Sequence, residues 1–124
     1  MSETPKALEH MLGAWNERDR EAVRGHLDRA LSEDVIFIDP THSTVGRDAF
    51  ETMVHDFRKQ FPDAVCSRSS GVDGHHNLYR YHWEIHQNGE LLVPGFDVAE
   101  LNDQGQVCRV EGFFGPLPPL TDDD

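Results

Sequence analysis

Two aspartates lie on apolar faces of predicted strands, where their types and spacing suit acid–base chemistry. Asp39 ends an apolar run in which Val35, Phe37 and Asp39 share one face. In the predicted strand 91–101, alternation makes Asp97 the only charge on an otherwise apolar side. A carboxyl group buried without a partner has a raised pKa and tends to hold its proton. The pair therefore predicts proton transfer, with Asp39 and Asp97 as candidate catalytic residues.

A structural role competes with the catalytic one for each aspartate. Asp39 precedes Pro40, and an Asp before a turn commonly accepts hydrogen bonds from backbone N–H groups, here near Thr41 and His42. Asp97 lies in the middle of a strand, where free backbone donors are scarce. The capping explanation is therefore stronger for Asp39 than for Asp97.

The histidines and cysteines predict neither a metal site nor a cofactor. His82 and His86 share a strand face with Glu84, but strand geometry places their Cα atoms about 13 Å apart, too far for one ion. The two cysteines, Cys66 and Cys108, lack C-x-x-C spacing and are expected to be reduced.

Charge and hydropathy exclude several classes of partner. The 124 residues carry a formal net charge of −12, which repels nucleic acid and anionic lipid. No apolar run approaches the roughly 20 residues of a membrane span, and the N-terminus lacks the pattern of a secretory signal. We expect a cytoplasmic protein that binds neither nucleic acid nor membrane.

Helical periodicity predicts three helices in the first half of the chain. The first begins at Thr4 and Pro5 and carries Leu8, Met11, Leu12 and Trp15 on one stripe. A second, shorter helix runs to Leu31. After the strand 35–39 and the loop 42–46, a third helix ends at Pro62.

The second half of the chain predicts an antiparallel meander. Turn signals such as Asn88–Gly89 separate strand candidates at 64–72, 78–87, 91–101 and 106–114. Helices followed by such strands indicate one α+β domain over 1–124, with an irregular tail at 116–124. Several strands are apolar on both faces, so we expect helices on the inner face and a homodimer partner on the outer one.

The chain resembles the NTF2-like superfamily, in particular its SnoaL-like branch and the ketosteroid isomerases. The resemblance covers nearly the whole chain. It rests on the order and spacing of "AWNERD", "DVIFIDP", "GRDAF" and "PGFDVAELNDQGQVCRVEGFFG". It implies an NTF2-like, or cystatin-like, cone, in which a strongly curved antiparallel sheet wraps around about three N-terminal helices.

The resemblance also implies roles for individual residues. By position, Asp39 matches the isomerase family's general base, and Asp97 matches its protonated, hydrogen-bond-donating acid. The family's oxyanion-binding Tyr falls at Met11, whose thioether cannot donate a hydrogen bond. Losing one such donor typically costs about 10² to 10³ in rate, so steroid isomerisation is disfavoured. Tyr81, Trp83 and His42 are candidate replacement donors.

These inferences predict a pocket for a small, mostly apolar molecule. A SnoaL-like protein of this kind would act as an isomerase, cyclase or dehydratase on a carbonyl compound. The alternatives are a pocket that binds a ligand without catalysis and a module that only dimerises. The residues expected to line the pocket are Met11, Trp15, Phe37, His42, Phe57, Tyr81, Trp83 and Phe114.

Overall fold

A computed structural model describes residues 4–122 of the chain, which form three α-helices and seven strands. The helices are α1 (Lys6–Asn16), α2 (Val23–Ala30), which follows a short 3₁₀ turn, and α3 (Arg47–Gln60). The strands are β1 (Leu31–Asp39), β2 (His42–Val45), β3 (Ala64–Arg68), β4 (Asp73–His75), β5 (Leu78–Gln87), β6 (Glu90–Leu101) and β7 (Val107–Phe114). None of the helices in this part of the chain is long and apolar enough to cross a membrane.

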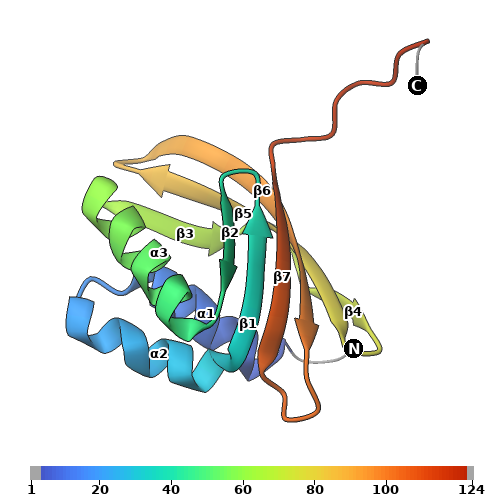
Figure 1. Ribbon diagram of the computed structural model, residues 1–124. Helices are drawn as coiled ribbons and strands as arrows, with labels where there is room; N and C mark the ends of the chain where they lie inside the picture. Colours follow the sequence, from blue (N-terminus) through green and yellow to red (C-terminus); the bar gives the residue numbers. More distant parts are fainter. Residues whose placement is uncertain (1–3, 123–124) are drawn as a thin grey trace.

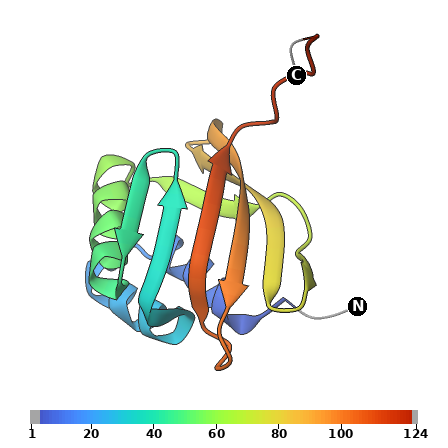
Figure 2. The ribbon, with the colours of Figure 1, turned by 45° about the vertical axis from the view of Figure 1, so that its right-hand side comes forward.

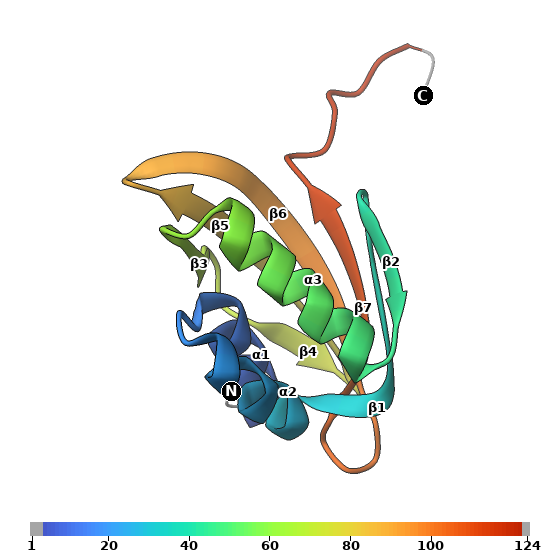
Figure 3. The ribbon, with the colours of Figure 1, turned by 60° about the vertical axis from the view of Figure 1, so that its left-hand side comes forward.

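All seven strands belong to one curved sheet that wraps around the helices, as the α+β prediction requires (Figures 1 and 3). The strand order is β2-β1-β7-β6-β5-β3, and β4 pairs with β5. The sheet is mixed rather than wholly antiparallel, because β1 and β7 pair in parallel. These two strands are joined through the rest of the chain, so no hairpin forces them to be antiparallel.

Local differences from the predicted elements lie mostly at turns. Residues 42–45, predicted as a loop, form β2, because Pro40 and Thr41 make a tight turn that pairs His42 with Asp39. The predicted strand 64–72 ends at Arg68, and residues 73–75 of the following turn form β4. Leu31 begins β1 instead of ending α2.

The start of the first helix also differs from the prediction. The sequence placed the start of this helix at Thr4 and Pro5, whereas Pro5 is the N-cap of α1 and the helix begins at Lys6, with no side-chain hydrogen bond at the cap. At the other end, Asn16 donates to the Cys66 carbonyl at 2.8 Å and accepts from the Cys66 N–H at 2.7 Å. The Asn16 side-chain amide thus forms the two hydrogen bonds that a neighbouring strand would form with Cys66, and it fixes α1 against β3.

An aromatic cluster fills the space between the helices and the inner face of the sheet. Trp15 of α1 contacts Phe37, Phe50 and Phe57, with ring centroids 5.4 to 6.2 Å apart. Phe50 is fully buried, and the inward-facing Val35 and Phe37 of β1 are also buried. The face that alternation gave to Val35, Phe37 and Asp39 is therefore the inner face of β1.

None of the helices in residues 4–122 lies over the outer face of the sheet (Figure 2). Ile38 and Phe113 lie there with 37% and 58% of their surface exposed. The chain then leaves β7 through an exposed segment without helix or strand, up to residue 122 (Figure 1). Residues 123–124 of the expected tail lie outside the described residues.

Candidate functional site

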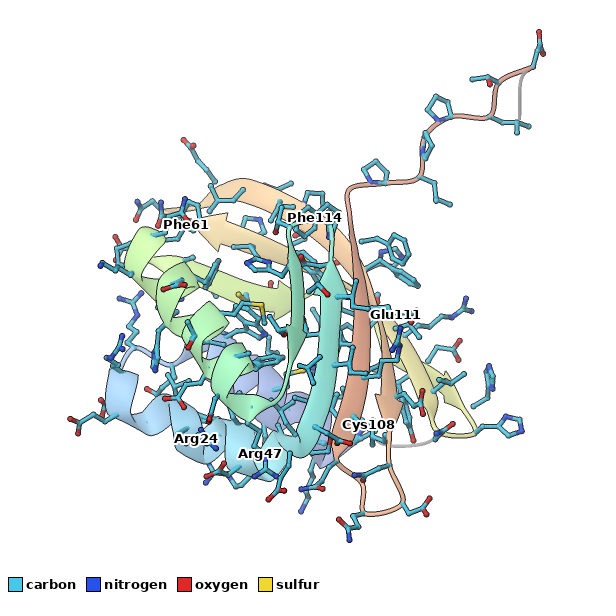
Figure 4. All side chains as sticks on the ribbon, in the orientation of Figure 1. Arg24, Arg47, Phe61, Cys108, Glu111 and Phe114 are labelled. Atoms are coloured by element: carbon cyan, nitrogen blue, oxygen red, sulfur yellow. The ribbon has the colours of Figure 1, made fainter. Side chains whose placement is uncertain are left out.

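A cavity of about 320 Å³ lies between α1, α3 and the concave face of the sheet. Phe61, next to the end of α3, and Phe114, at the end of β7, both line it and lie at the same end of the molecule (Figure 4). Both aspartates border this single cavity. So do the eight side chains singled out from the sequence, namely Met11, Trp15, Phe37, His42, Phe57, Tyr81, Trp83 and Phe114.

Asp97 projects from β6 into the cavity and is held by two donors from the neighbouring strand β5. The Tyr81 hydroxyl donates to Oδ2 at 3.1 Å, and the Trp83 indole N–H donates to Oδ1 at 2.9 Å. Burial raises the pKa of Asp97 to about 6, the two hydrogen bonds oppose the rise, and the charge of Asp39 adds to it. This carboxyl group can therefore bind and release a proton near neutral pH.

Asp39 ends β1 at the same cavity, and its Oδ1 caps the turn that follows. Oδ1 accepts from the Thr41 N–H at 2.9 Å and lies 3.1 Å from His42 Nδ1. The capping role considered from the sequence is thus present, but it leaves Asp39 on the cavity wall. Oδ2 has no hydrogen-bond partner among residues 4–122. A turn role and a chemical role are compatible at this residue.

Gly112 of β7 separates the two acids, because β7 lies between β1 and β6. A Cβ atom at this position would lie 2.9 Å from Oδ1 of Asp97 and 3.3 Å from the Cβ of Asp39. Asp97 is also the register partner of Gly112. The missing side chain is therefore what lets both carboxyl groups occupy this part of the cavity. Gly112 could not be identified from the sequence, because nothing in the sequence reveals the alignment of β1, β6 and β7.

A methyl group at Gly112 is predicted to disturb the position of Asp97. Gly112→Ala should displace Asp97, because 2.9 Å is too short for a carbon–oxygen contact, and should stretch its bond from Trp83. We expect the Trp83 indole N–H proton resonance to move upfield while the Trp15 resonance stays in place. Overpacking should lower the free energy of unfolding by about 1 to 3 kcal/mol.

Gly71→Ala is the matched control, because a Cβ at Gly71 meets no atom within 4 Å. Both indole resonances should stay unchanged in this variant. An unchanged Trp83 resonance in Gly112→Ala would show that the two acids do not depend on this glycine.

Met11 and two of its candidate replacement donors, Tyr81 and Trp83, all line the cavity. Met11 is buried and lines the cavity. Tyr81 and Trp83, considered as replacements, both donate to Asp97. Burial raises the pKa of the Tyr81 hydroxyl well above its ordinary value, so it stays a donor. Tyr81 and Trp83 therefore hold the Asp97 carboxyl group and do not themselves take the place of the missing oxyanion donor.

Arg68 is a cavity residue that the sequence analysis missed. Its guanidinium pairs with Glu9 of α1 and lies 6.0 Å from the centre of the Tyr81 ring. Alternation in β3 places Arg68 on the same face as Ala64 and the cavity-lining Cys66, a signal that could have identified it. Burial raises the pKa of the Cys66 thiol to about 12, which makes it a poor nucleophile.

The histidines of β5 lie away from the cavity. His82 packs against Phe96 with ring centroids 5.0 Å apart, and His86 lies 3.6 Å from Glu84. Within residues 4–122, no three His, Cys, Asp or Glu side chains are grouped to hold a metal ion.

Comparisons with known proteins agree on one family. The profile of the SnoaL-like domain matches residues 8–110. No functionally curated protein matches the chain. Among solved structures, a candidate isomerase of the SnoaL-like family from Agrobacterium tumefaciens is 29% identical, with a TM-score of 0.84 over 90% of this chain and 96% of that one.

More distant structures share the fold. A candidate polyketide cyclase from Sinorhizobium meliloti is 14% identical, with a TM-score of 0.71 over 88% of this chain and 94% of that one. A protein with a cystatin-like fold from Silicibacter pomeroyi is 18% identical, with a TM-score of 0.66 over 91% and 76% of the two chains. The cone-shaped α+β architecture predicted from the sequence is therefore confirmed.

Proposed function

Because the chain belongs to the SnoaL-like domain family of the NTF2-like superfamily, we propose that it catalyses proton transfer beside the carbonyl group of a small, mostly apolar compound. Isomerisation and cyclisation are the reaction types that this chemistry suits best. The observation that carries the proposal is a pair of carboxyl groups on one apolar cavity, one of which has a pKa of about 6.

The size and lining of the cavity favour a compact substrate. Its volume of about 320 Å³ falls at the lower end of the 300 to 1,000 Å³ typical of small-molecule sites. Trp15, Phe37 and Phe57 give it an aromatic wall. A molecule of one to three fused rings that carries one carbonyl group fits this description.

In the proposed reaction, Asp97 acts as the acid. Its protonated carboxyl donates a hydrogen bond to the substrate carbonyl oxygen, in the place of the donor that Met11 cannot supply. With a pKa of about 6, about one Asp97 in ten still carries its proton at pH 7. The end of the cavity that contains Asp39 supplies the base that removes the proton from the α-carbon.

A proton-exchange assay tests this proposal directly. The bicyclic apolar ketone 2-tetralone exchanges its α-protons for deuterium in D₂O through its enolate, and NMR follows the loss of the α-proton signals. We expect the protein to accelerate this exchange at pH 6 to 7. Exchange at the buffer rate, despite binding of 2-tetralone measured by calorimetry, would favour the second candidate, a pocket that binds without catalysis. The observation that favours this second candidate is Met11 at the position of the missing donor.

The expected homodimer also stays a proposal. The exposed Ile38 and Phe113 on the uncovered sheet face support it. Sedimentation analysis would detect such a dimer as twice the mass of one chain.

A further inference from the structure

His42 and Asp39 form a hydrogen-bonded pair at the edge of the cavity. Nδ1 of His42 lies 3.1 Å from Oδ1 of Asp39 and 2.9 Å from the hydroxyl of Thr41. The hydroxyl in turn donates to the same Oδ1 at 3.3 Å. His42 lines the cavity with 44% of its side chain exposed, whereas the side chain of Asp39 is only 11% exposed.

The contacts of His42 favour one position for its ring hydrogen. An ionised carboxylate can only accept, whereas the Thr41 hydroxyl, 2.9 Å from Nδ1 and 3.3 Å from Asp39 Oδ1, can both accept and donate one hydrogen. A carboxylate is stabilised most by charge-assisted donors, so we assign both the hydroxyl hydrogen and the Nδ1 hydrogen to Asp39 Oδ1. This assignment leaves Nε2 with a free lone pair in the neutral ring. Within the part of the chain that the structure describes, no other group forms a hydrogen bond with Nε2.

We propose that His42 Nε2 is the general base of this site and that Asp39 is the positioning residue that orients the imidazole and stabilises its charged form. The inference rests on the proposed function and names the atom that receives the proton. A base whose tautomer is fixed by a hydrogen bond to another side chain is a recurrent arrangement in active sites. Asp39 is suited to the supporting role, because its Oδ1 already binds the turn and the ring.

The proton transfer balances within the cavity. Nε2 takes a proton from the α-carbon, and the C–H electron pair forms the carbon–carbon double bond of the enolate. The carbonyl oxygen gains negative charge and is bound by the protonated Asp97. The Nε2–H then returns a proton, or a deuteron after exchange with D₂O, to carbon. The other charged groups that line the cavity are Asp56 and Arg68.

Substitutions at His42 test this assignment in the 2-tetralone assay. His42→Ala should lower the exchange rate by about 10² to 10⁴, the contribution that a general base typically makes. Imidazole added to the buffer should restore part of the rate, because the position is open to solvent. His42→Gln should lose as much rate without rescue, because the glutamine fills the space that imidazole would enter.

Two further variants test which member of the His42–Asp39 pair is the base and whether the effect is specific to the cavity. Asp39→Asn keeps an oxygen that accepts from Nδ1, so it should lose less rate than His42→Ala. His86→Ala is the matched control, because His86 also lies near a carboxylate, that of Glu84, but outside the cavity. A wild-type rate in His42→Ala would overturn the assignment. So would a larger loss in Asp39→Asn than in His42→Ala, which would make Asp39 the base.

A spectroscopic test does not depend on activity. The ¹⁵N resonances of His42, assigned by their loss in His42→Gln, should show the Nδ1–H tautomer in the neutral ring. The Nε2–H tautomer would overturn the inference even if the protein catalyses exchange. Absence of exchange with 2-tetralone in the wild type would instead count against the proposed function.

Discussion

Replacing Asp97 with asparagine is expected to stabilise the protein at pH 8 and to lower the proposed proton-transfer activity. Burial raises the pKa of Asp97 from 3.8 to about 6, so the folded protein binds this proton more tightly than the unfolded chain. At a pH above 6 the carboxylate is charged in both states, and its burial costs up to about 3 kcal/mol. Asparagine removes this cost and still offers an oxygen to Trp83.

The stabilisation should depend on pH in a defined direction. A raised pKa means that the penalty is absent below about pH 4, grows between pH 4 and pH 6, and is complete above pH 6. Urea unfolding at pH 4, 6 and 8 should therefore show a gain for Asp97→Asn that increases with pH. An equal gain at all three values would mean that Asp97 has no raised pKa.

The catalytic part of this prediction is measured on the same protein. Loss of the acid should lower the 2-tetralone exchange rate by about 10² to 10³. Glu100→Gln is a matched control, because Glu100 also lies on β6 but is absent from the cavity lining. A variant that is more stable and equally active would show that Asp97 takes no part in the chemistry.

The sequence was sufficient to predict which side chains face inward. Strands have a side-chain period of two, so alternation placed Asp97 on the apolar side of its strand, and Asp97, Tyr81 and Trp83 all line the cavity. The two aspartates could be picked out from the sequence because a charged residue on an apolar strand face is unusual.

The sequence was insufficient where the site depends on how strands align. The two hydrogen bonds to Asp97 arise because Tyr81 pairs with Asp97 and Trp83 with Gly95, and register between strands is a long-range property. The parallel pairing of β1 with β7 brings Gly112 between the acids for the same reason. The contact of His42 with Asp39 required the turn that creates β2, which the sequence analysis treated as a loop.

Gly95 controls the position of Trp83, and its replacement should disturb the site more than any other single added methyl group. A Cβ at Gly95 would lie 2.0 Å from Cζ2 and 2.3 Å from Cε2 of the Trp83 ring. The indole lies directly on the bare backbone of β6 with its N–H directed at Asp97. An alanine at this position cannot coexist with that ring position.

Gly95→Ala should therefore push the indole away and break its hydrogen bond to Asp97. Overpacking together with the lost charge-assisted bond should lower the free energy of unfolding by about 2 to 4 kcal/mol. Because the Trp83 bond lowers the pKa of Asp97, its loss should raise that pKa above 6. Carboxyl ¹³C NMR measures this pKa, and urea unfolding measures the stability.

Trp83→Phe distinguishes the clash from the lost hydrogen bond. The phenyl ring is smaller and has no N–H, so this variant loses the donor while Gly95 keeps its open backbone. The pKa of Asp97 should rise in both variants, whereas the methyl clash should affect Gly95→Ala alone. If the pKa of Asp97 stayed at about 6 in both, burial, Tyr81 and the charge of Asp39 would govern this carboxyl group without Trp83. The close approach of Trp83 to Gly95 would then contribute to packing without affecting the pKa of Asp97.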